Sequence, residues 1–375
     1  MKRSATVSPP APKRIKSQKD SSDSVEGSQL RDSAKSKELL PGSNLPGHVK
    51  TMRLFSWNIN GVSLFLQRPI TSFVNASQTA NATATRIAQK VPAAASLRDF
   101  LCRHSWPELL FLQEVKINTN DTKTQRTVER AVNLKSTMAD SGPVYLTFFT
   151  LPRDKYNAKG FGGKLYGVCT IIEEVFYNQY VSSVTSVPWD QEGRVSVVSL
   201  YNKMAIYNIY AVNGTSSPYW SPASGEVVGT RHEHKRNFHK LLAEECKRRE
   251  HDGWHIIIAG DLNVAPERID GHPNLRTFPA EHVTNRADFR TNFLIENEKS
   301  LGVVDVWRRL NPNVKKFTYH PRNIDWGLSC DRVDLVLVSK VLFESGGVIE
   351  AEIWDSPQER STSDHVPISI QISLA

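Results

Sequence analysis

His255-Ile256-Ile257-Ile258-Ala259-Gly260-Asp261-Leu262-Asn263 is the stretch that decides the fold of this chain. Its apolar run is too short for a helix and rich in β-branched residues, which predicts a strand over 255–259. The strand ends abruptly in polar residues, of which Asp261 and Asn263 carry groups that can do chemistry. The same combination of apolar run and polar ending recurs along the chain on both sides of this stretch.

Working outward, short apolar runs of the same kind predict further strands at 53–57, 108–112, 144–149, 166–172, 194–200, 205–210, 335–338, 351–354 and 367–372. Helices are predicted between them at 96–104, 124–139, 228–250 and 286–300. The helix at 228–250 has a one-sided apolar stripe that includes Phe238, Leu241 and Leu242. Many strands with interspersed helices predict an α+β fold, a four-layer α/β/β/α sandwich of two mainly antiparallel sheets packed face to face.

The first 50 residues differ in composition from the rest. They are rich in Ser, Lys, Asp and Pro and poor in aromatic residues, so they cannot bury enough apolar surface to fold. Lys13-Arg14-Ile15-Lys16, with Lys2-Arg3 upstream, is similar to a nuclear localisation signal, which predicts a nuclear protein. A solvated charge run or an arm that grips DNA is the alternative. We therefore expect a disordered tail over 1–50 and one catalytic domain over 51–375.

Bulk properties narrow the classes of partner. The formal net charge is +8, which favours polyanions such as nucleic acid, although many soluble proteins carry such a charge without binding one. The four cysteines are scattered and form no CxxC pair, so neither a zinc site nor a disulfide framework is expected. The sequence contains neither a membrane span nor a secretory h-region. We expect a soluble, intracellular monomer with no membrane partner.

Polar residues at strand ends are the most informative feature of the chain. One such residue usually caps a turn. Several in one domain are different, because the ends of neighbouring strands converge at one rim of a sandwich. That rim would bring together Asn58, Glu114, Asp261, Asn263, Asp334, Asp364 and His365.

Four carboxylates in a small volume repel one another unless a cation lies between them. The set is rich in oxygen ligands, has few nitrogens and has no thiolate, which indicates Mg²⁺, with Mn²⁺ as a possible substitute, rather than Zn²⁺. Such a site suits phosphoryl transfer, because a metal neutralises phosphate oxygens and a carboxylate can activate a water. With no Cys or Ser nucleophile beside a base, attack by water is expected.

At this point seven short motifs carry a family resemblance. In chain order they are Ser56-Trp57-Asn58-Ile59-Asn60-Gly61, Leu112-Gln113-Glu114-Val115-Lys116, Asp190-Gln191-Glu192-Gly193-Arg194, Ile209-Tyr210-Ala211-Val212-Asn213-Gly214, Gly260-Asp261-Leu262-Asn263-Val264-Ala265, Arg332-Val333-Asp334 and Ser363-Asp364-His365-Val366-Pro367-Ile368. Their order and spacing resemble the exonuclease III/AP endonuclease branch of the endonuclease/exonuclease/phosphatase superfamily. The resemblance covers residues 52 to 375.

The resemblance implies a role for each matching residue. Glu114 would be the main metal ligand, helped by Asn58 and Asp364, with Asn60 behind them. Asp261 would orient or deprotonate the attacking water. Asp261 and Asn263 also belong to the expected metal-site set.

Further roles concern the phosphate. Asn263 and His365 would hold the scissile phosphate, and Asp334 would orient His365. Tyr210 and Asn213 would contact the same phosphate. The resemblance also makes Lys116 and Arg194 supports near the site that bind substrate.

Two positions depart from the family pattern. Members that cleave at abasic sites cover the baseless sugar with an apolar pocket, whereas motif alignment puts Asp331 and Lys316 at two of its positions. Charged groups are costly in a dry pocket unless they are paired, and a salt bridge between these two is one solution. The stretch 67–95 and the Gly-rich loop 159–164 fall where DNA-contacting loops are expected.

The resulting prediction is a Mg²⁺-dependent DNA phosphodiesterase of the base-excision repair type. It would cut the backbone 5′ to abasic sites, act as a 3′→5′ exonuclease, or clean 3′ ends, with DNA, expected as a duplex, as its partner. A superfamily phosphatase, an RNA nuclease or deadenylase, and a non-catalytic DNA-binding derivative are the alternatives.

Overall fold

The computed structural model describes residues 51–66, 96–135, 140–158, 160–298 and 300–374. The predicted tail over 1–50 and the predicted loop at 67–95 lie outside these residues, as does Lys159 of the Gly-rich loop. The division into a tail and one catalytic domain therefore stays a prediction. In the described part of the chain, no helix is long and apolar enough to cross a membrane. All four cysteines are free.

One six-stranded sheet combines both ends of the described chain. Its order is β15-β16-β1-β2-β4-β3. Only β1 and β2 run parallel, and the other neighbours are antiparallel. The strands are β1 (Thr51–Asn58), β2 (Leu109–Gln113), β3 (Tyr145–Thr150), β4 (Val168–Glu173), β15 (Val348–Ile353) and β16 (Ile368–Ser373).

The second six-stranded sheet has the order β12-β14-β10-β7-β6-β5, with only β7 and β10 parallel. Both sheets are therefore mixed and mainly antiparallel. The strands are β5 (Val181–Ser186), β6 (Val195–Leu200), β7 (Met204–Tyr210), β10 (His255–Asp261), β12 (Val304–Asp305) and β14 (Asp334–Val338). Two short ladders complete the strands: β8 (Pro218–Trp220) with β9 (Val227–Thr230), and β11 (Gly271–His272) with β13 (Cys330–Asp331).

Side chains that alternate along each strand pack on opposite faces of the sheet and so belong to different cores. In β1, Met52 and Leu54 belong to the core between the two sheets, whereas Phe55 and Trp57 belong to a second core on the outer face. In β10, Ile257 faces the middle core and its neighbours face the opposite side. This period of two requires apolar residues at every position of a strand that is buried on both faces.

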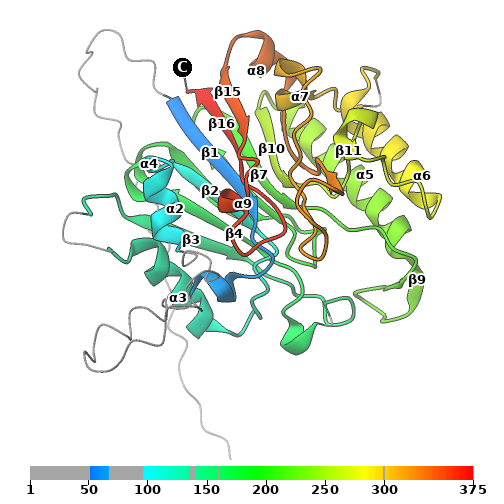
Figure 1. Ribbon diagram of the computed structural model, residues 1–375, viewed down its shortest axis with the longest axis horizontal. Coiled ribbons are helices and arrows are strands. Elements are labelled where there is room, and N and C mark those ends of the chain that lie inside the picture. The colour runs from blue at the N-terminus through cyan, green and yellow to red at the C-terminus, as the bar shows by residue number, and fades with distance from the viewer. Residues whose placement is uncertain (1–50, 67–95, 136–139, 159, 299, 375) are drawn as a thin grey trace, which may run out of the picture. The chain divides into compact units, whose positions relative to one another are not determined.

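The helices cover the outer faces of the sheets, as Figure 1 shows for α2 and α3 on one side and α5 and α6 on the other. The predicted α+β, four-layer sandwich is therefore confirmed. The helices are α2 (Leu97–Arg103), α3 (Thr122–Asn133), α4 (Glu174–Tyr180), α5 (Arg231–His251), α6 (Glu281–Phe289), α7 (Val306–Leu310), α8 (Lys340–Glu344) and α9 (Pro357–Arg360), with short turns η1 (Val62–Phe65), η2 (Phe161–Gly163), η3 (Arg268–Asp270) and the π-turn η4 (Arg290–Leu294).

The predicted strands are all present, but three helix boundaries were wrong. The helix predicted at 228–250 begins at Arg231, because Thr230 and Glu233 form a capping box and 227–230 pairs as β9. The helix predicted at 286–300 instead begins at Glu281, and its π-turn ends at Leu294. The helix predicted at 124–139 ends at Asn133, although residues 136–139 lie outside the described ranges.

Candidate active site

Six strand ends meet at one rim of the sandwich. The parallel pairing of β1 with β2 sets Asn58 opposite Gln113, directly before Glu114. In the other sheet, the register sets Asp261 opposite both Tyr210 and Asp334. The segment before β16 joins them, since Ser363 Oγ donates to the Asn58 carbonyl at 2.6 Å. The predicted convergence is confirmed, and it draws on both sheets.

Gly260 allows this approach immediately before Asp261. Its φ is +148°, and a Cβ at this position would lie 1.9 Å from the Ile209 carbonyl oxygen of β7. Four residues around the rim also adopt positive φ without being glycine: Asn60 (50°), Glu114 (54°), Lys116 (54°) and Asn263 (52°). Such conformations are costly and concentrate where the surrounding structure imposes them, typically at functional sites.

The rim opens into a cavity of about 620 Å³. Most of the predicted site residues line it: Asn58, Asn60, Glu114, Tyr210, Asn213, Asp261, Asn263, Asp364 and His365. Within the described ranges, Asp334, Lys116 and Arg194 stand behind this lining rather than in it. The cavity is of a size that holds small ligands or part of a larger one.

Carboxylates and amides gather at one end of the cavity. The Asn58 amide nitrogen donates to Asp261 Oδ2 at 2.9 Å and to Glu114 Oε2 at 3.2 Å. Asn60 Nδ2 donates to Asp364 Oδ1 at 3.0 Å. Lys116 Nζ lies 2.9 Å from Glu114 Oε1 and pairs with Asn60 as well. The side-chain oxygens of Glu114, Asn58 and Asp364 form a ligand set that fits a hard divalent cation such as Mg²⁺.

A second group could also hold a metal ion. One ligand atom each from Asp261, Asp334 and His365 lies within 4.8 Å of the others, and all three residues are buried. However, His365 Nδ1 is already engaged with Asp334 Oδ2 at 2.7 Å. We favour the end of the cavity formed by Glu114, Asn58 and Asp364, because it is built from oxygen ligands and contains no buried carboxylate–imidazole pair; Glu114 Oε1 there lies 2.9 Å from Lys116 Nζ.

His365 is held as a cation. Burial lowers the pKa of His365, but the charges of Asp334 and Asp261 and the hydrogen bond to Asp334 outweigh burial and raise it to about 10. Asp334 is fixed in turn, because Thr318 Oγ1 accepts from the Asp334 backbone N–H at 3.0 Å. Trp57 Nε1 donates to the His365 carbonyl at 3.0 Å and fixes its backbone.

Asp261 lies at the centre of the constellation. Burial raises its pKa, the charge of His365 lowers it and Asp334 raises it again, to about 7. A carboxylate with such a pKa can exchange a proton near neutral pH. Its Oδ1 accepts from the Asn263 backbone N–H at 2.8 Å. Burial and the charge of Glu114 raise the pKa of Tyr210 well above its usual value, so that its phenol stays a neutral donor.

We predict that Asp334→Asn shifts the alkaline limb of the pH–activity profile to lower pH. With a raised pKa, His365 stays protonated until the pH approaches about 10 in the native chain. Asp334 is the largest cause that raises this pKa, so its neutralisation lets His365 lose its proton earlier. Profiles of kcat/KM for both proteins measure the shift. An unchanged alkaline limb in Asp334→Asn would contradict the assigned pairing.

Arg194 supports the site from behind. It is buried, and its Nη1 donates to the Tyr210 carbonyl at 3.1 Å and to the Ala211 carbonyl at 3.2 Å. Its guanidinium lies 3.8 Å from the centre of the Tyr166 ring and pairs with Glu192. In the described structure it does not line the cavity, and it contacts site residues through the Tyr210 and Ala211 carbonyls. Its predicted role in substrate binding stays a prediction, as does that of Lys116, which contacts Glu114.

The two departures from the abasic-pocket pattern behave differently. Asp331 lines the cavity. Lys316 does not line it in the described structure. Lys316 instead pairs with Glu352 at 3.4 Å and donates to the Ile353 carbonyl at 3.2 Å. The salt bridge between Lys316 and Asp331, considered above as one way to pair these charges, does not form, because Lys316 turns toward β15.

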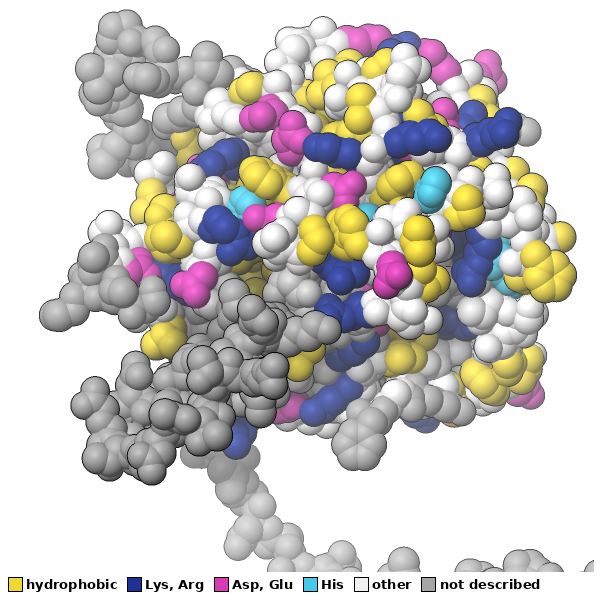
Figure 2. Space-filling model, in the orientation of Figure 1, with side chains coloured by type: hydrophobic (Ala, Val, Ile, Leu, Met, Phe, Trp, Pro, Cys, Tyr) yellow, Lys and Arg dark blue, Asp and Glu magenta, His cyan; other side chains and the backbone are white. Residues whose placement is uncertain are grey.

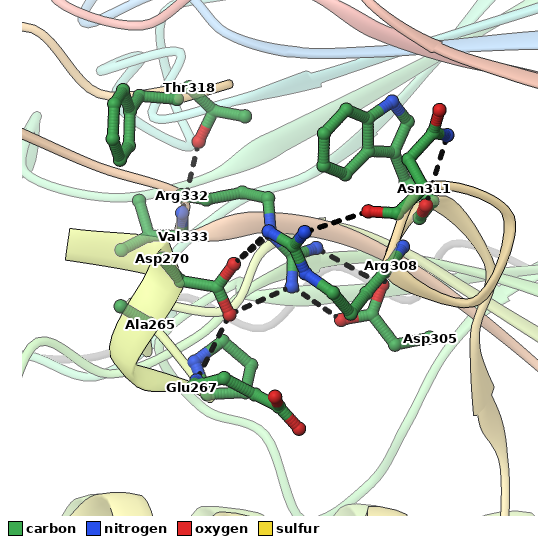
Figure 3. A network of polar contacts seen from close by, with 12 residues as sticks. Ala265, Glu267, Asp270, Asp305, Arg308, Asn311, Thr318, Arg332 and Val333 are labelled. Atoms are coloured by element: carbon green, nitrogen blue, oxygen red, sulfur yellow. Dashed lines mark hydrogen bonds and ion pairs between the residues drawn. The ribbon is translucent and has the colours of Figure 1, made fainter. Parts of the chain in front are cut away.

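A buried ion-pair network fixes the backbone that carries Asp334 (Figure 3). Arg332 donates to Asp270 at 2.7 and 3.0 Å and to Asp305 at 2.6 and 3.0 Å. Arg308 donates to the same Asp270 at 2.6 Å. These bonds tie η3, β12 and α7 to the segment before β14.

Several residues around the cavity were not predicted from the sequence. Lys235 of α5, Arg276, His282 and Arg286 all line it, as does Tyr319. Lys235 is 2% exposed, although it lies among the basic residues that the amphipathic pattern of the helix assigns to solvent. No local pattern distinguishes such a lysine, because its burial depends on α6 and on the segment after β11.

Fold and site together define a two-sheet sandwich whose strand ends form a carboxylate-rich cavity. The model of the Endonuclease/Exonuclease/phosphatase family matches residues 55–365, and the chain belongs to this family. The described part of the chain is therefore grouped with hydrolases of phosphate esters. A search of curated proteins found no match.

Solved structures with the same fold share little sequence with this chain. AP endonuclease LMAP from Leishmania major is 17% identical with a TM-score of 0.58, and 87% of this chain and 88% of that chain are covered. The APE2 catalytic domain from Xenopus laevis is 18% identical with a TM-score of 0.55, over 86% and 93%. The 3′ phosphatase NExo from Neisseria, bound to product DNA hairpin, is 16% identical with a TM-score of 0.52, over 86% and 99%. At these identities the likeness establishes the fold.

Proposed function

We propose that this chain is a Mg²⁺-dependent DNA phosphodiesterase that cuts 5′ to abasic sites or processes 3′ ends, as a 3′→5′ exonuclease or an end-cleaning enzyme. The observation that carries the proposal is the position of Asp261. It lies between the Asn58 and Glu114 side chains on one side and the His365–Asp334 pair on the other, at the cavity wall. This arrangement would set a base, a metal site and a cationic donor around one space.

Glu114, Asn58 and Asp364 would hold the metal ion, with Asn60 orienting Asp364. When bound, Mg²⁺ supplies positive charge to the phosphate and to the leaving oxygen. Mn²⁺ has similar ligand preferences and would substitute for it.

The chain's own residues supply the rest of the reaction. Asp261 would orient a water and take its proton, which its pKa of about 7 suits. Protonated His365 and the Asn263 amide would donate to the phosphate oxygens as negative charge develops. Tyr210 and Asn213, which line the same cavity, would add further donors. No side chain needs to form a covalent intermediate.

The net charge of the whole chain favours DNA as the substrate, and residues 1–50 contribute ten Lys and Arg against five Asp and Glu to it. The chain carries a net charge of +8, and Figure 2 shows Lys and Arg side chains gathered across the middle of the face in view. Electrostatic attraction of phosphates supplies much of the affinity of such surfaces for nucleic acid. Among the relatives, two are named AP endonuclease or APE2 and one is bound to product DNA. We take the enzyme to act as a monomer.

The alternatives remain testable. A phosphatase or RNA deadenylase of the superfamily would use the same metal end of the cavity on another substrate. A non-catalytic DNA-binding derivative is disfavoured, since Glu114, Asp261 and His365 are all present and close together. Inositol phosphates and poly(A) are the substrates that would reveal the first two activities.

A gel assay tests the proposal directly. Purified full-length protein with Mg²⁺ is given a labelled duplex with one abasic-site analogue, beside the undamaged duplex with a recessed 3′ end. We expect incision at the analogue or laddering from the 3′ end, and neither with Glu114→Ala. If neither duplex is cut while inositol phosphates or poly(A) are, the DNA assignment is wrong.

Nuclear action is the remaining part of the proposal, and it is supported by the basic cluster near Lys13. A chain without residues 1–50 should cut the same duplexes at an unchanged rate but accumulate less in nuclei as a fluorescent fusion. Loss of cleavage on short duplexes would instead make the tail a DNA-binding arm.

A further inference from the structure

The cavity has a basic side that the cleaved phosphate does not account for. Lys235 of α5, Arg276 of the segment after β11, and Arg286 of α6 all line it. We call these three residues the basic lobe. Among the described carboxylates that line the cavity, Glu114, Asp261 and Asp364 belong to the metal end, which leaves Asp331 to face the basic lobe.

Two of the three cations are held in place by backbone carbonyls. Lys235 Nζ donates to the Asn263 carbonyl at 2.7 Å, which sets it directly beside the phosphate-binding residues. Arg286 donates to the Ala265 carbonyl at 2.9 Å and to the Arg276 carbonyl at 2.8 Å. The second bond holds the Arg276 backbone against α6. Lys235 and Arg286 are thus fixed parts of the basic lobe, and Arg276 is an exposed side chain on an anchored backbone.

Among the described residues, Asp331 offsets only part of the positive charge of the lobe. Lys235 and Arg286 hydrogen bond to neutral carbonyls, and the Arg276 guanidinium has no ion-pair partner within 4.0 Å among the described residues. Burial lowers the pKa of Lys235 to about 7; Asp261 opposes this, and Arg194 and Arg276 lower it further. Lys235 is therefore only partly charged near neutral pH, and an anion bound beside it would favour its ammonium form. The pKa of His282 falls to about 4 through burial and then through Arg276. The combined charge of such clustered groups attracts and stabilises a bound anion.

The chemistry of the lobe excludes a dry sugar pocket. Two guanidinium groups, an ammonium and a carboxylate are costly to cover with an apolar ring. They suit phosphate, whose oxygens accept hydrogen bonds from several cations at once. The cavity volume of about 620 Å³ leaves room beyond one phosphate group.

We infer that the basic lobe binds a second phosphate group of the substrate, next to the phosphate that is cleaved. The inference rests on the proposed function, because it assumes that the first phosphate lies beside Asn263 and His365. The second phosphate could be the neighbouring diester of a strand or a terminal monoester. Either source would select substrates with two adjacent phosphates over those with one.

Binding without turnover tests the inference. Full-length protein with Ca²⁺ in place of Mg²⁺ is titrated by calorimetry with the dinucleotide dTpdT, its 5′- and 3′-phosphorylated forms, and the trinucleotide dTpdTpdT. We expect at least one ligand with a second phosphate to bind about tenfold more tightly than dTpdT, as one charge-assisted interaction would give. Tighter binding by a phosphorylated dinucleotide alone identifies a terminal monoester, and tighter binding by the trinucleotide identifies a neighbouring diester.

Arg276→Gln should abolish most of this preference and leave the affinity for dTpdT unchanged. Arg276 is exposed, so the variant is expected to fold. Arg268→Gln is the matched control, since it removes an equal charge from an exposed residue of η3 that does not line the cavity. Equal affinities for all four ligands, including no detectable binding of any, overturn the inference, as does a preference that survives in Arg276→Gln. A protein that shows the preference but cuts no substrate with Mg²⁺ contradicts only the proposed function.

Discussion

Asp261→Asn should lower kcat at least about 10³-fold, within the range that loss of a catalytic base produces, and should leave the chain folded. The substitution keeps the shape of the side chain, and its single carbonyl oxygen can keep one of the two hydrogen bonds that the carboxylate accepts, from the Asn58 amide or from the Asn263 backbone. It removes the group that can take a proton from water. The cavity and the metal end remain intact, so substrate affinity should change far less than turnover.

The free energy of unfolding of Asp261→Asn should be higher than that of the native chain, or unchanged. Burial raises the pKa of Asp261 to about 7, which means that the native fold disfavours its charge at neutral pH. A neutral asparagine removes that penalty, as expected where a catalytic group is held at a cost to the fold. Urea denaturation of both proteins at pH 8, where the native carboxylate is mostly charged, measures this effect.

A matched control separates the site from general effects of charge. Asp252→Asn removes a carboxylate at the exposed end of α5, three residues before β10, and should leave both kcat and the urea midpoint unchanged. If Asp261→Asn keeps more than a tenth of the native kcat, Asp261 is not the base. Glu114→Ala should also be inactive. Raising the Mg²⁺ concentration should not restore its activity, because the variant lacks a metal ligand.

The metal end of the site could be predicted from the sequence because its signals are local. Each of Asn58, Glu114 and Asp261 follows directly on an apolar strand, and a polar residue at such a place is visible without knowledge of the fold. The strands themselves follow from short β-branched runs. The convergence of their ends then follows from the packing of two sheets.

The basic lobe could not be predicted in this way. Lys235 is buried by elements that lie far away in the sequence, and α6 begins after Ala280, which offers no capping side chain to mark the start. Lys316 was misplaced for a related reason. It follows an irregular segment, where a shift of one residue turns a side chain to the opposite side, and its partner Glu352 lies in a distant strand.

The ion-pair network around Arg332 could not be predicted from local sequence patterns either, since Arg332 and Asp270 are 62 residues apart.

Asp270→Ala should lower the free energy of unfolding by about 3–5 kcal/mol, the range found when one partner of a buried ion pair is removed. Asp270 is fully buried and accepts from both Arg332 and Arg308. Its loss leaves the Arg332 guanidinium with Asp305 as its carboxylate partner and the Arg308 guanidinium with backbone carbonyls alone.

Chemical denaturation of Asp270→Ala and Glu267→Ala gives the comparison. Glu267 lies on the same turn, but its carboxylate is half exposed and pairs with a partly exposed Arg290, so its removal should cost less than about 1 kcal/mol. Equal losses for the two variants would contradict the role of the network. A loss of about 3–5 kcal/mol is a large share of the total stability of a domain, so Asp270→Ala should be assayed at low temperature. If the folded fraction then shows a lower kcat with an unchanged KM, the network also positions Asp334, because Arg332 stands two residues before it in the chain.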